Sequence, residues 1–488
     1  MSTKASYFFQ TLAVIFISAL GFLFFKEVLP KRIFSESTIS SKNVIVDSLL
    51  LETIALEEEV KTDEKTIDTF YRKKIVFEQI EGIAYPPEEY GQYKGFQYLI
   101  PFFEKLYQLE TKQEGDIRIA YFGDSMTDGD LIVQDFRKAM QTQFGGEGVG
   151  FVSITSESAG SRSSISHQYS GNWKTQSYLN VKRPLKPFGV NGHVFFANDT
   201  LSDTWVRYKA GFGMHTSQLN NPTLFYGNSS NKMGEMLIKI GKDTLIKKLN
   251  PEKQLNALAI STTNLKSFKA VFKQADSIPI YGFNFDDGKG VHVDNFSNRG
   301  NSGLPISTFN TNLMKQFQER LDYDLIILHY GTNVLNYGTY NYNWYEKGMT
   351  RVVNHIKECF PGVTILVIST ADKATKYELE MKTDSAVVPL TLAQRKYAVQ
   401  SKAGYFNLYE AMGGEGSMAK WAEEVPPMAN KDYTHFNYKG AQKVAGLLYD
   451  QIQTGYAQYK LMRKNKKVLP TKPTVDSVSS KNNTVNAQ

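Results

Sequence analysis

The fold is decided by the stretch Ile117-Arg118-Ile119-Ala120-Tyr121-Phe122-Gly123-Asp124-Ser125-Met126-Thr127-Asp128-Gly129. A short apolar run of β-favouring residues ends abruptly in Gly-Asp-Ser, and an amphipathic segment follows from Asp130 to Gln143. This pattern predicts a strand, a tight turn and a helix. Ser125 then lies at the carboxyl end of a strand and beside a helix N-terminus, where open α/β sheets bind ligands. Because a lone serine there is usually a helix cap, a chemical role needs partners elsewhere in the chain.

The composition describes a globular protein of several units. At 488 residues the chain is too long for one ordinary domain, and the hydrophobic content of 41% with 22% charged residues indicates a sizeable core. The net charge of +7 is modest and spread along the chain, which argues against nucleic-acid binding. The single cysteine, Cys359, excludes intramolecular disulfides and cysteine-built zinc sites.

An apolar stretch over residues 7–25 predicts a transmembrane anchor. A helix of this length spans about 28 Å, enough for a bilayer core. A cleaved signal peptide is the alternative, but the stretch is long for one and no small-residue cleavage site follows it. Lys26, Lys31 and Arg32 outweigh Lys4 with the terminal amine, so the charge rule alone would leave the body in the cytoplasm.

The rest of the chain divides by texture. Residues 26–95 are polar and mixed in charge, which predicts a stalk or linker. Short β-like runs broken by Gly, Asn, Asp and Ser predict an inserted all-β sandwich over 152–289, with a hairpin around Gly241. Helical and strand patterns over 96–151 and 290–456 predict one split α/β domain with a final helix from about Asn437 to Ile452. The basic and then Ser/Asn/Thr-rich residues 457–488 predict a disordered tail.

Two features of the central region have competing interpretations. The glycine-rich run over 144–151 suggests nucleotide binding, but it follows a helix and lacks the G-x-G-x-x-G spacing, so we predict a helix stop and a turn. The aromatic residues of the insert suit a sugar platform or a β-domain core, and the core is the commoner role. These aromatic residues are Tyr169, Trp173, Trp205 and Tyr208.

A nucleophilic serine needs a base, a group that orients the base, and donors for the oxyanion. Among seven histidines, only His435 has an aspartate three residues before it, in Asp432-Tyr433-Thr434-His435. On a turn, this spacing places the carboxylate against the imidazole and fixes its tautomer. Taken alone, however, the same pattern is common where a helix begins.

Candidate oxyanion donors follow two further predicted strands. Asn333 lies in Gly331-Thr332-Asn333, after the apolar run Asp324–His329, and its side-chain amide is a neutral donor. Gly300 lies in the loop after Val291–Asp294 and presents a backbone N–H with no side chain in the way. Each is a loop residue by default, yet four strand-end or pre-helix elements meet at one edge of one sheet.

These blocks occur in the order typical of the SGNH (GDSL-type) hydrolase family, which the sequence resembles from about 96 to 452 without the insert. The matching blocks are Gly123–Ser125, Asn295–Gly300, Gly331–Asn333 and Asp432–His435. The resemblance implies a three-layer α/β/α sandwich with a parallel sheet, Ser125 as nucleophile, His435 as base and Asp432 as its orienter. It also implies an oxyanion hole made by the Gly300 backbone, the Asn333 side chain and the Ser125 amide, with no metal or organic cofactor.

A narrower likeness concerns the substrate. Asp128-Gly-Asp-Leu, the glycine-rich run over 144–151 and the β-rich insert are similar to bacterial peptidoglycan O-acetylesterases, whose inserted module resembles a carbohydrate-binding domain. This implies a serine esterase that removes O-acetyl groups from an envelope polysaccharide such as peptidoglycan. A polysaccharide O-acetyltransferase with the same triad and an inactive glycan-binding envelope protein are the alternatives. Because wall glycan lies outside the cytoplasm, we set the charge rule aside and expect a single-pass inner-membrane protein with its catalytic body in the periplasm.

Overall fold

The computed structural model describes residues 16, 47, 49–50, 72–198, 202–335 and 340–464. The elements below belong to the compact unit Ile45–Gln488. Apart from Phe16, the anchor predicted over 7–25 lies outside the described residues, as do residues 465–488 of the predicted tail. Among the residues that are described, no helix is both long enough and apolar enough to cross a membrane.

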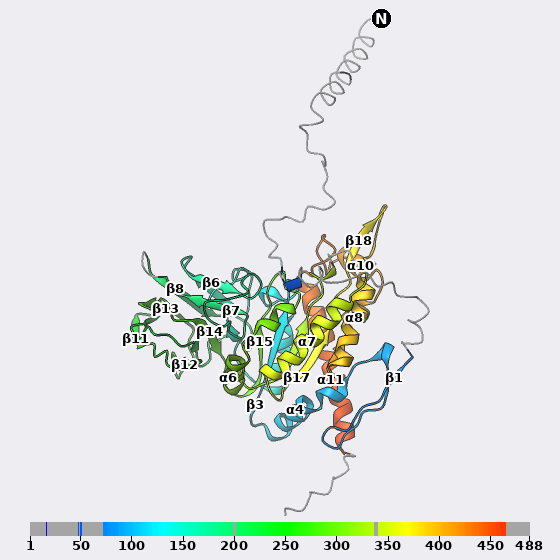
Figure 1. Ribbon diagram of the computed structural model, residues 1–488, viewed down its shortest axis with the longest axis horizontal. Coiled ribbons are helices and arrows are strands. Elements are labelled where there is room, and N and C mark those ends of the chain that lie inside the picture. Colours follow the sequence, from blue (N-terminus) through cyan, green and yellow to red (C-terminus); the bar gives the residue numbers. More distant parts are fainter. Residues whose placement is uncertain are drawn as a thin grey trace, which may run out of the picture. The chain divides into compact units, whose positions relative to one another are not determined.

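A five-stranded parallel sheet forms the centre of the α/β part (Figure 1). Its order is β15-β3-β16-β17-β20, so the connections change direction beside β3, where open sheets of this kind place their ligands. The strands are buried on both faces, which explains their continuous apolar runs. Their bounds are β3 Asp116–Gly123, β15 Gly290–Asn295, β16 Tyr323–His329, β17 Thr364–Ile368 and β20 Gly404–Phe406.

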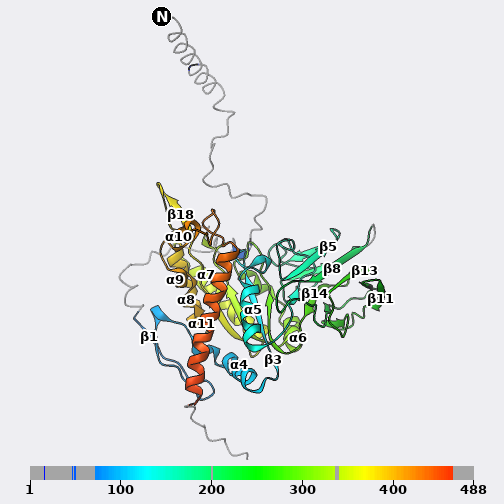
Figure 2. The same cartoon turned by 180° about the vertical axis from the view of Figure 1, so that it is seen from behind.

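Helices cover both faces of this sheet, as the two opposite views show (Figures 1 and 2). One layer holds α6 Thr311–Leu321, α7 Asn343–Cys359 and α8 Val387–Gln400. The other holds α4 Ile100–Lys112, α5 Val133–Phe144 and α11 Tyr438–Lys464. The predicted α/β fold with a parallel sheet is therefore confirmed.

Short elements fill the connections between these layers. The short helices are η1 Tyr90–Gln92, η2 Phe96–Leu99, η3 Asp128–Asp130, η4 Leu304–Thr308, α9 Leu408–Met412 and α10 Ser417–Glu423. Two small antiparallel pairs join β1 Lys74–Ile75 to β2 Glu88–Glu89, and β18 Ala374–Tyr377 to β19 Glu380–Thr383.

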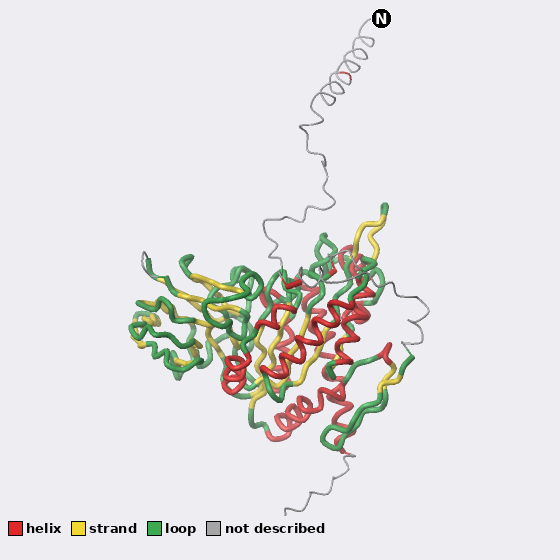
Figure 3. The backbone as a smooth tube through the Cα atoms, viewed as in Figure 1, coloured by secondary structure: helices red, strands yellow, loops and turns green. Residues whose placement is uncertain are grey.

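Two further sheets lie between β3 and β15 in the sequence, and Figure 3 shows strands and loops through this segment. The first contains β11 Asp243–Lys248, β10 Glu235–Ile240, β13 Ser267–Lys273, β8 Thr204–Ala210 and β5 Ile165–Tyr169. The second contains β12 Asn256–Ala259, β9 Thr223–Tyr226, β14 Ile280–Phe285, β7 His193–Phe196 and β6 Lys174–Ser177, and β4 Gly150–Val152 pairs with β14.

These two sheets share a hydrophobic core of their own. Tyr208 of β8 and Phe283 of β14 come from different sheets, and their rings meet edge to face at 5.4 Å. Tyr208 and Trp173 are buried in this core, whereas Trp205 is half-buried with the Lys269 ammonium 4.0 Å above its ring. Tyr169 is partly buried against the same core, so core packing involves three of the four aromatic residues noted in the sequence.

The described part of the predicted stalk packs on the α/β domain. Tyr85, Tyr90 and Tyr93 are buried. The Tyr93 hydroxyl donates to the Ala403 carbonyl at 2.7 Å, and the Tyr85 hydroxyl donates to the Gly455 carbonyl at 3.1 Å. The tyrosines that anchor this stretch to the domain are spaced irregularly. They therefore gave no periodic signal within a polar sequence.

The last helix runs further than the sequence pattern indicated. α11 continues to Lys464, so residues 457–464 of the predicted tail are helical. Tyr456 and Tyr459 are buried beside Phe103, and the Tyr456 hydroxyl donates to Glu110 at 2.6 Å. Arg463 adds a hydrogen bond to Glu104 at 2.8 Å, so side-chain contacts with α4 extend the helix.

Arg118 of β3 joins the parallel sheet to the β-rich segment. Its guanidinium donates to Asp294 at 2.8 and 3.1 Å and to Asp286 at 2.7 Å. Asp294, which is 0% exposed, also accepts the Phe151 N–H at 2.8 Å and the Tyr323 hydroxyl at 2.7 Å. One buried guanidinium therefore forms ion pairs with two carboxylates at the point where the chain enters and leaves the β-rich segment.

Replacing Arg118 by Met is expected to lower the free energy of unfolding by about 3–5 kcal/mol, because it leaves Asp294 and Asp286 buried without their cation. Urea denaturation measures the change. Arg207→Met, which removes an exposed arginine from β8, is the matched control and is expected to stay within about 0.5 kcal/mol of the parent. Equal effects of the two variants would contradict the structural role of Arg118.

Candidate active site

Ser125 stands on a tight turn directly after β3. Gly123 is required there, because a Cβ atom would lie 2.1 Å from the Thr127 hydroxyl oxygen. Asp124 is buried and accepts the Met126 N–H at 2.9 Å, which closes the turn below the serine. Each residue of the Gly-Asp-Ser sequence thus has one role. Gly123 allows close packing of the backbone, Asp124 fixes the turn, and Ser125 places its side chain at the edge of the sheet.

The helix after this turn begins later than predicted. α5 starts at Val133, and η3 precedes it, because Gly129, Asp130 and Ile132 have φ values of 70°, 71° and 64°. The residue that precedes α5 at its N-cap is Ile132. Ser125 is therefore not the cap of the helix, and the structural alternative that its position suggested does not apply.

Ser125, His435 and Asp432 form a continuous chain of hydrogen bonds. The Ser125 hydroxyl lies 2.9 Å from His435 Nε2, and His435 Nδ1 lies 2.8 Å from Asp432 Oδ2. The other oxygen of Asp432 accepts the backbone N–H groups of Thr434 and His435, each at 3.0 Å. The aspartate is thus fixed by its own turn, and it fixes the imidazole with Nε2 facing the serine.

The hydrogen bond with Asp432 stabilises the protonated form of the His435 imidazole. The hydrogen bond with Asp432 raises the pKa of His435 above its ordinary value, although burial acts against it. Burial also acts to raise the pKa of Asp432, but the hydrogen bonds from the His435 side chain and backbone hold that pKa below its ordinary value. Burial raises the pKa of Asp124 to about 6 despite the Met126 N–H bond.

Gly300 and Asn333 follow β15 and β16, the two strands that flank β3 in the sheet. Gly300 has φ of 76°, a conformation that favours glycine. The Asn333 amide donates to the Asn301 carbonyl at 3.1 Å, so it contacts the loop of Gly300. The structure gathers both residues at the edge that carries Ser125, while the hydrogen bond found for Asn333 goes to Asn301 and not to the serine.

Asn295 and Arg299 connect the second motif to the first. The Asn295 amide donates to the Thr127 carbonyl at 2.9 Å, which makes it a brace for the serine turn. Arg299 donates to Asp128 at 2.5 Å, and its positive charge acts to lower the pKa of His435. Sequence reasoning missed this pair, although Asp128 follows the serine block and Arg299 directly precedes Gly300.

Asp47 is a second residue that sequence reasoning missed. It is buried and accepts the Ser302 N–H at 3.2 Å and the Leu49 N–H at 3.0 Å, and it also binds the Ser302 hydroxyl. It therefore holds the loop just after Gly300 and Asn301 from a segment far upstream. A lone aspartate in a polar stretch gives no signal by which this contact could have been found.

No group of three or more His, Cys, Asp or Glu side chains is arranged to hold a metal ion in the part of the chain that the structure describes. The reactive groups brought together here are a hydroxyl, an imidazole and a carboxylate. This set suits nucleophilic acyl transfer, in which the imidazole moves the hydroxyl proton.

Comparison with known proteins identifies the class. Residues 276–443, which contain three of the four blocks, match the model of the GDSL-like lipase/acylhydrolase family. The resemblance to SGNH (GDSL-type) hydrolases is thus confirmed over this part of the chain, and the match supports a hydrolase with an SGNH-like α/β fold. A search of curated proteins finds no significant match.

Among solved structures, a peptidoglycan O-acetylesterase is similar to this chain, with a TM-score of 0.60 and 22% sequence identity. The match covers 75% of this chain and 96% of that one. A family two carbohydrate esterase from Cellvibrio japonicus matches with a TM-score of 0.25 and 10% identity over 60% of this chain and 98% of its own, which is too weak to add to the comparison.

Substituting Asp432 by Asn is expected to lower the pKa of His435 toward its ordinary value, because the carboxylate hydrogen bond is the main cause of the rise. An NMR titration of the imidazole measures the shift. Asp450→Asn, which removes an exposed carboxylate of α11, is the control and is expected to leave the His435 titration unchanged. An unchanged or higher His435 pKa in the Asp432 variant would show that the pair is not coupled as the geometry indicates.

Proposed function

We propose that the chain is a serine esterase that removes O-acetyl groups from a cell-envelope polysaccharide, in the first place peptidoglycan, with its catalytic body in the periplasm. The observation that carries the proposal is the hydrogen-bonded chain from Ser125 through His435 to Asp432 at the carboxyl edge of the sheet. The similarity in fold to a peptidoglycan O-acetylesterase supports the choice of substrate.

In the acylation step, His435 Nε2 takes the proton of Ser125 while the serine oxygen attacks the acetyl carbonyl carbon. Asp432 stabilises the imidazolium that forms, since its carboxylate accepts the Nδ1–H. The Gly300 backbone N–H and the Asn333 amide are assigned to the oxyanion, together with the Ser125 N–H. Collapse breaks the bond between the acetyl carbon and the sugar oxygen, and the imidazolium gives its proton to that oxygen, which leaves as the sugar hydroxyl.

Deacylation repeats the same steps with water as the nucleophile. His435 removes a proton from the water, the acetyl–serine bond breaks, and acetate leaves with the Ser125 hydroxyl restored. Every proton in this cycle moves through one nitrogen atom, His435 Nε2. The fixed tautomer that Asp432 imposes is therefore the geometric requirement for both halves of the reaction.

Ser125→Ala is expected to lower kcat for acetate release by roughly 10³-fold or more, because no other group can form the acyl-enzyme. The substrates are p-nitrophenyl acetate and O-acetylated peptidoglycan, and loss of fluorophosphonate labelling provides a second measurement. Ser230→Ala, at an exposed loop position of the β-rich segment, is the matched control and keeps full activity. Normal turnover by folded Ser125→Ala protein would exclude the proposed mechanism.

Asn333→Ala is expected to lower kcat by about 10² to 10³-fold with little change in KM, because the lost donor acts on charge that develops only in the transition state. Steady-state kinetics with p-nitrophenyl acetate separate the two constants. Circular dichroism controls for the loss of the Asn301 contact, which the same substitution removes. A rise in KM at constant kcat would instead assign Asn333 to ground-state binding.

A further inference from the structure

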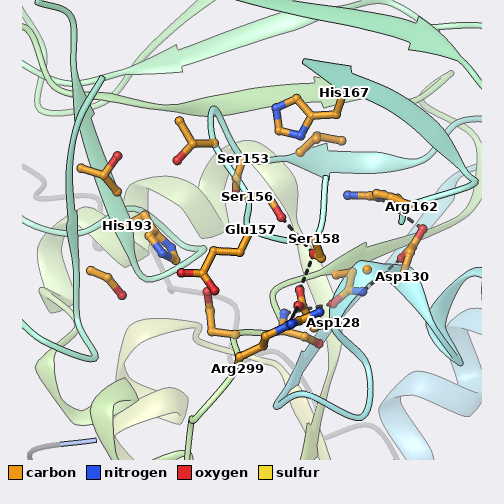
Figure 4. A pocket seen from close by; sticks show the side chains of 18 of the residues that line it. Asp128, Asp130, Ser153, Ser156, Glu157, Ser158, Arg162, His167, His193 and Arg299 are labelled. Atoms are coloured by element: carbon orange, nitrogen blue, oxygen red, sulfur yellow. Dashed lines mark hydrogen bonds and ion pairs between the residues drawn. The ribbon is translucent and has the colours of Figure 1, made fainter. Parts of the chain in front are cut away.

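A cavity of about 320 Å³ lies between the hydrolase loops and the first part of the β-rich segment (Figure 4). Its walls come from residues 128–130, from parts of the range 152–193 and from residues 295–299. Neither Ser125 nor His435 lines it. The cavity is therefore separate from the triad, although both use the loop that ends at Gly300.

Arg162 gives one wall of this cavity an excess of positive charge. Its Nε donates to the Ser164 hydroxyl at 2.9 Å, and its Nη2 lies 3.3 Å from Asp130 Oδ2. Asp130 already accepts two hydrogen bonds from Arg137, at 2.8 and 3.0 Å. Two arginines thus share one carboxylate, and one positive charge lacks an anion of its own.

The hydrogen bonds of Arg162 are also incomplete. Its Nη2 is buried and makes no well-aligned hydrogen bond among the described residues, although Asp130 Oδ2 lies 3.3 Å away. Figure 4 shows Arg162 on the Asp130 side of the cavity, with the end of its side chain directed toward Ser158. Since a buried guanidinium is costly without acceptors, this wall is suited to an anionic ligand group, for which a carboxylate has the matching bidentate geometry.

Asp128, a second carboxylate that lines the cavity, is already paired. One of its oxygens accepts a hydrogen bond from Ser158 at 2.6 Å, and the other accepts one from Arg299 at 2.5 Å. Ser158 in turn lies 3.0 Å from the Ser156 hydroxyl. The centre of the cavity therefore presents hydroxyl groups and a neutralised ion pair.

The opposite wall offers neutral hydrogen-bonding groups (Figure 4). His193 Nδ1 lies 2.9 Å from the Asn191 carbonyl, so this nitrogen carries the proton and Nε2 is an acceptor. Burial lowers the pKa of His193, which keeps the ring neutral. Glu157 is exposed and lies on the His193 side, away from Arg162. Sugar hydroxyl and amide N–H groups suit these acceptors.

We propose that this cavity is a second binding site that holds a carboxylate-bearing unit of the glycan, with the carboxylate on Arg162 and the sugar hydroxyl and amide groups on Ser156, Ser158 and His193. The inference rests on the proposed function, because it specifies the chemical class of that substrate. The volume is at the small end of the range for ligand sites, about 300–1,000 Å³, which suits one sugar unit and its substituent.

Arg299 relates this site to the reaction. It lines the cavity, its charge acts on His435, and the next residue is Gly300. A glycan unit bound in the cavity would therefore contact Arg299, whose charge acts on His435. In peptidoglycan, the carboxylate comes either from the lactyl group of a muramoyl unit without peptide or from the stem peptide, and both share the chemistry that Arg162 recognises.

Binding of three soluble probes to the full chain tests the proposal. N-acetylmuramic acid carries the lactyl carboxylate, N-acetylmuramoyl-L-alanyl-D-isoglutamine carries its carboxylate on the peptide, and N-acetylglucosamine is the neutral counterpart. Ligand-observed NMR is expected to show at least one carboxylated probe binding about tenfold or more tightly than N-acetylglucosamine. The better of the two carboxylated probes identifies the source of the charge.

Two variants locate the binding, and one serves as control. Arg162→Gln is expected to abolish the preference for carboxylated probes, while Asp130 stays paired with Arg137. Thr155→Trp fills the cavity without changing its charge, and it is expected to weaken binding of every probe. Arg207→Gln, at an exposed position on β8, retains the parent behaviour.

Three results would overturn the proposal: equal affinity for charged and neutral probes, an unchanged preference in both cavity variants, or no binding up to about 10 mM. None of the probes carries an O-acetyl group, so binding does not depend on Ser125. Failure of Ser125-dependent acetate release with intact carboxylate binding rejects the esterase alone. Acetate release without any charge preference rejects the cavity site alone.

Discussion

The strands that precede three of the four motif loops meet at one buried carboxylate, Asp294 of β15. Desolvating this group is costly, and the cost is met by donors from three directions: Arg118 of β3, Tyr323 of β16 and the backbone of Phe151. Gly150 fits beside it only as glycine, since a Cβ atom would lie 2.0 Å from the Asp294 oxygen. These contacts hold three strands and the start of the β-rich segment in fixed relative positions. The loops at the ends of the strands are therefore fixed relative to one another as well.

Further hydrogen bonds connect β15 to the turn that carries Ser125 and to the helix that follows it. Arg137 of α5 donates to the Val293 carbonyl at 2.7 Å, which ties the helix after Ser125 to the strand before Gly300. Asn295 binds the Thr127 carbonyl and Asp130, so the second motif holds the turn of the first. The triad and the cavity wall share these supports, because Asp130 accepts from Asn295, Arg137 and Ser164. Substrate contacts and catalytic geometry are thus built on a common frame.

The sequence predicts the parallel sheet and its motif loops because those signals are local. An apolar run followed by Gly-Asp-Ser or Gly-x-Asn is visible within a dozen residues, and parallel strands bring their ends together. The bracing contacts are not local: Arg118 meets Asp294 across 176 residues, Asp47 meets Ser302 across 255, and Tyr93 meets Ala403 across 310. A single polar or aromatic residue has no periodicity, so nothing in the sequence marks it as a distant partner. The late start of α5 is likewise a matter of backbone conformation at Asp130 and Ile132.

The pairing of β4 with β14 has a consequence for how the chain is assembled. Phe151 lies opposite Asn284 and Gly150 opposite Phe285, so the strands that enter and leave the β-rich segment run side by side. Gly145 and Gly290 also approach so closely that a Cβ on Gly290 would lie 2.3 Å from the Gly145 carbonyl carbon. Seen from the parallel sheet, the whole segment is therefore equivalent to a hairpin connection between α5 and β15. Once the segment has folded on its own core, the number of residues within it no longer sets the entropy cost of closing the connection. The short distance between its two ends sets that cost. The parallel sheet can accommodate so long a β-rich segment between α5 and β15 because the two ends of that segment lie side by side.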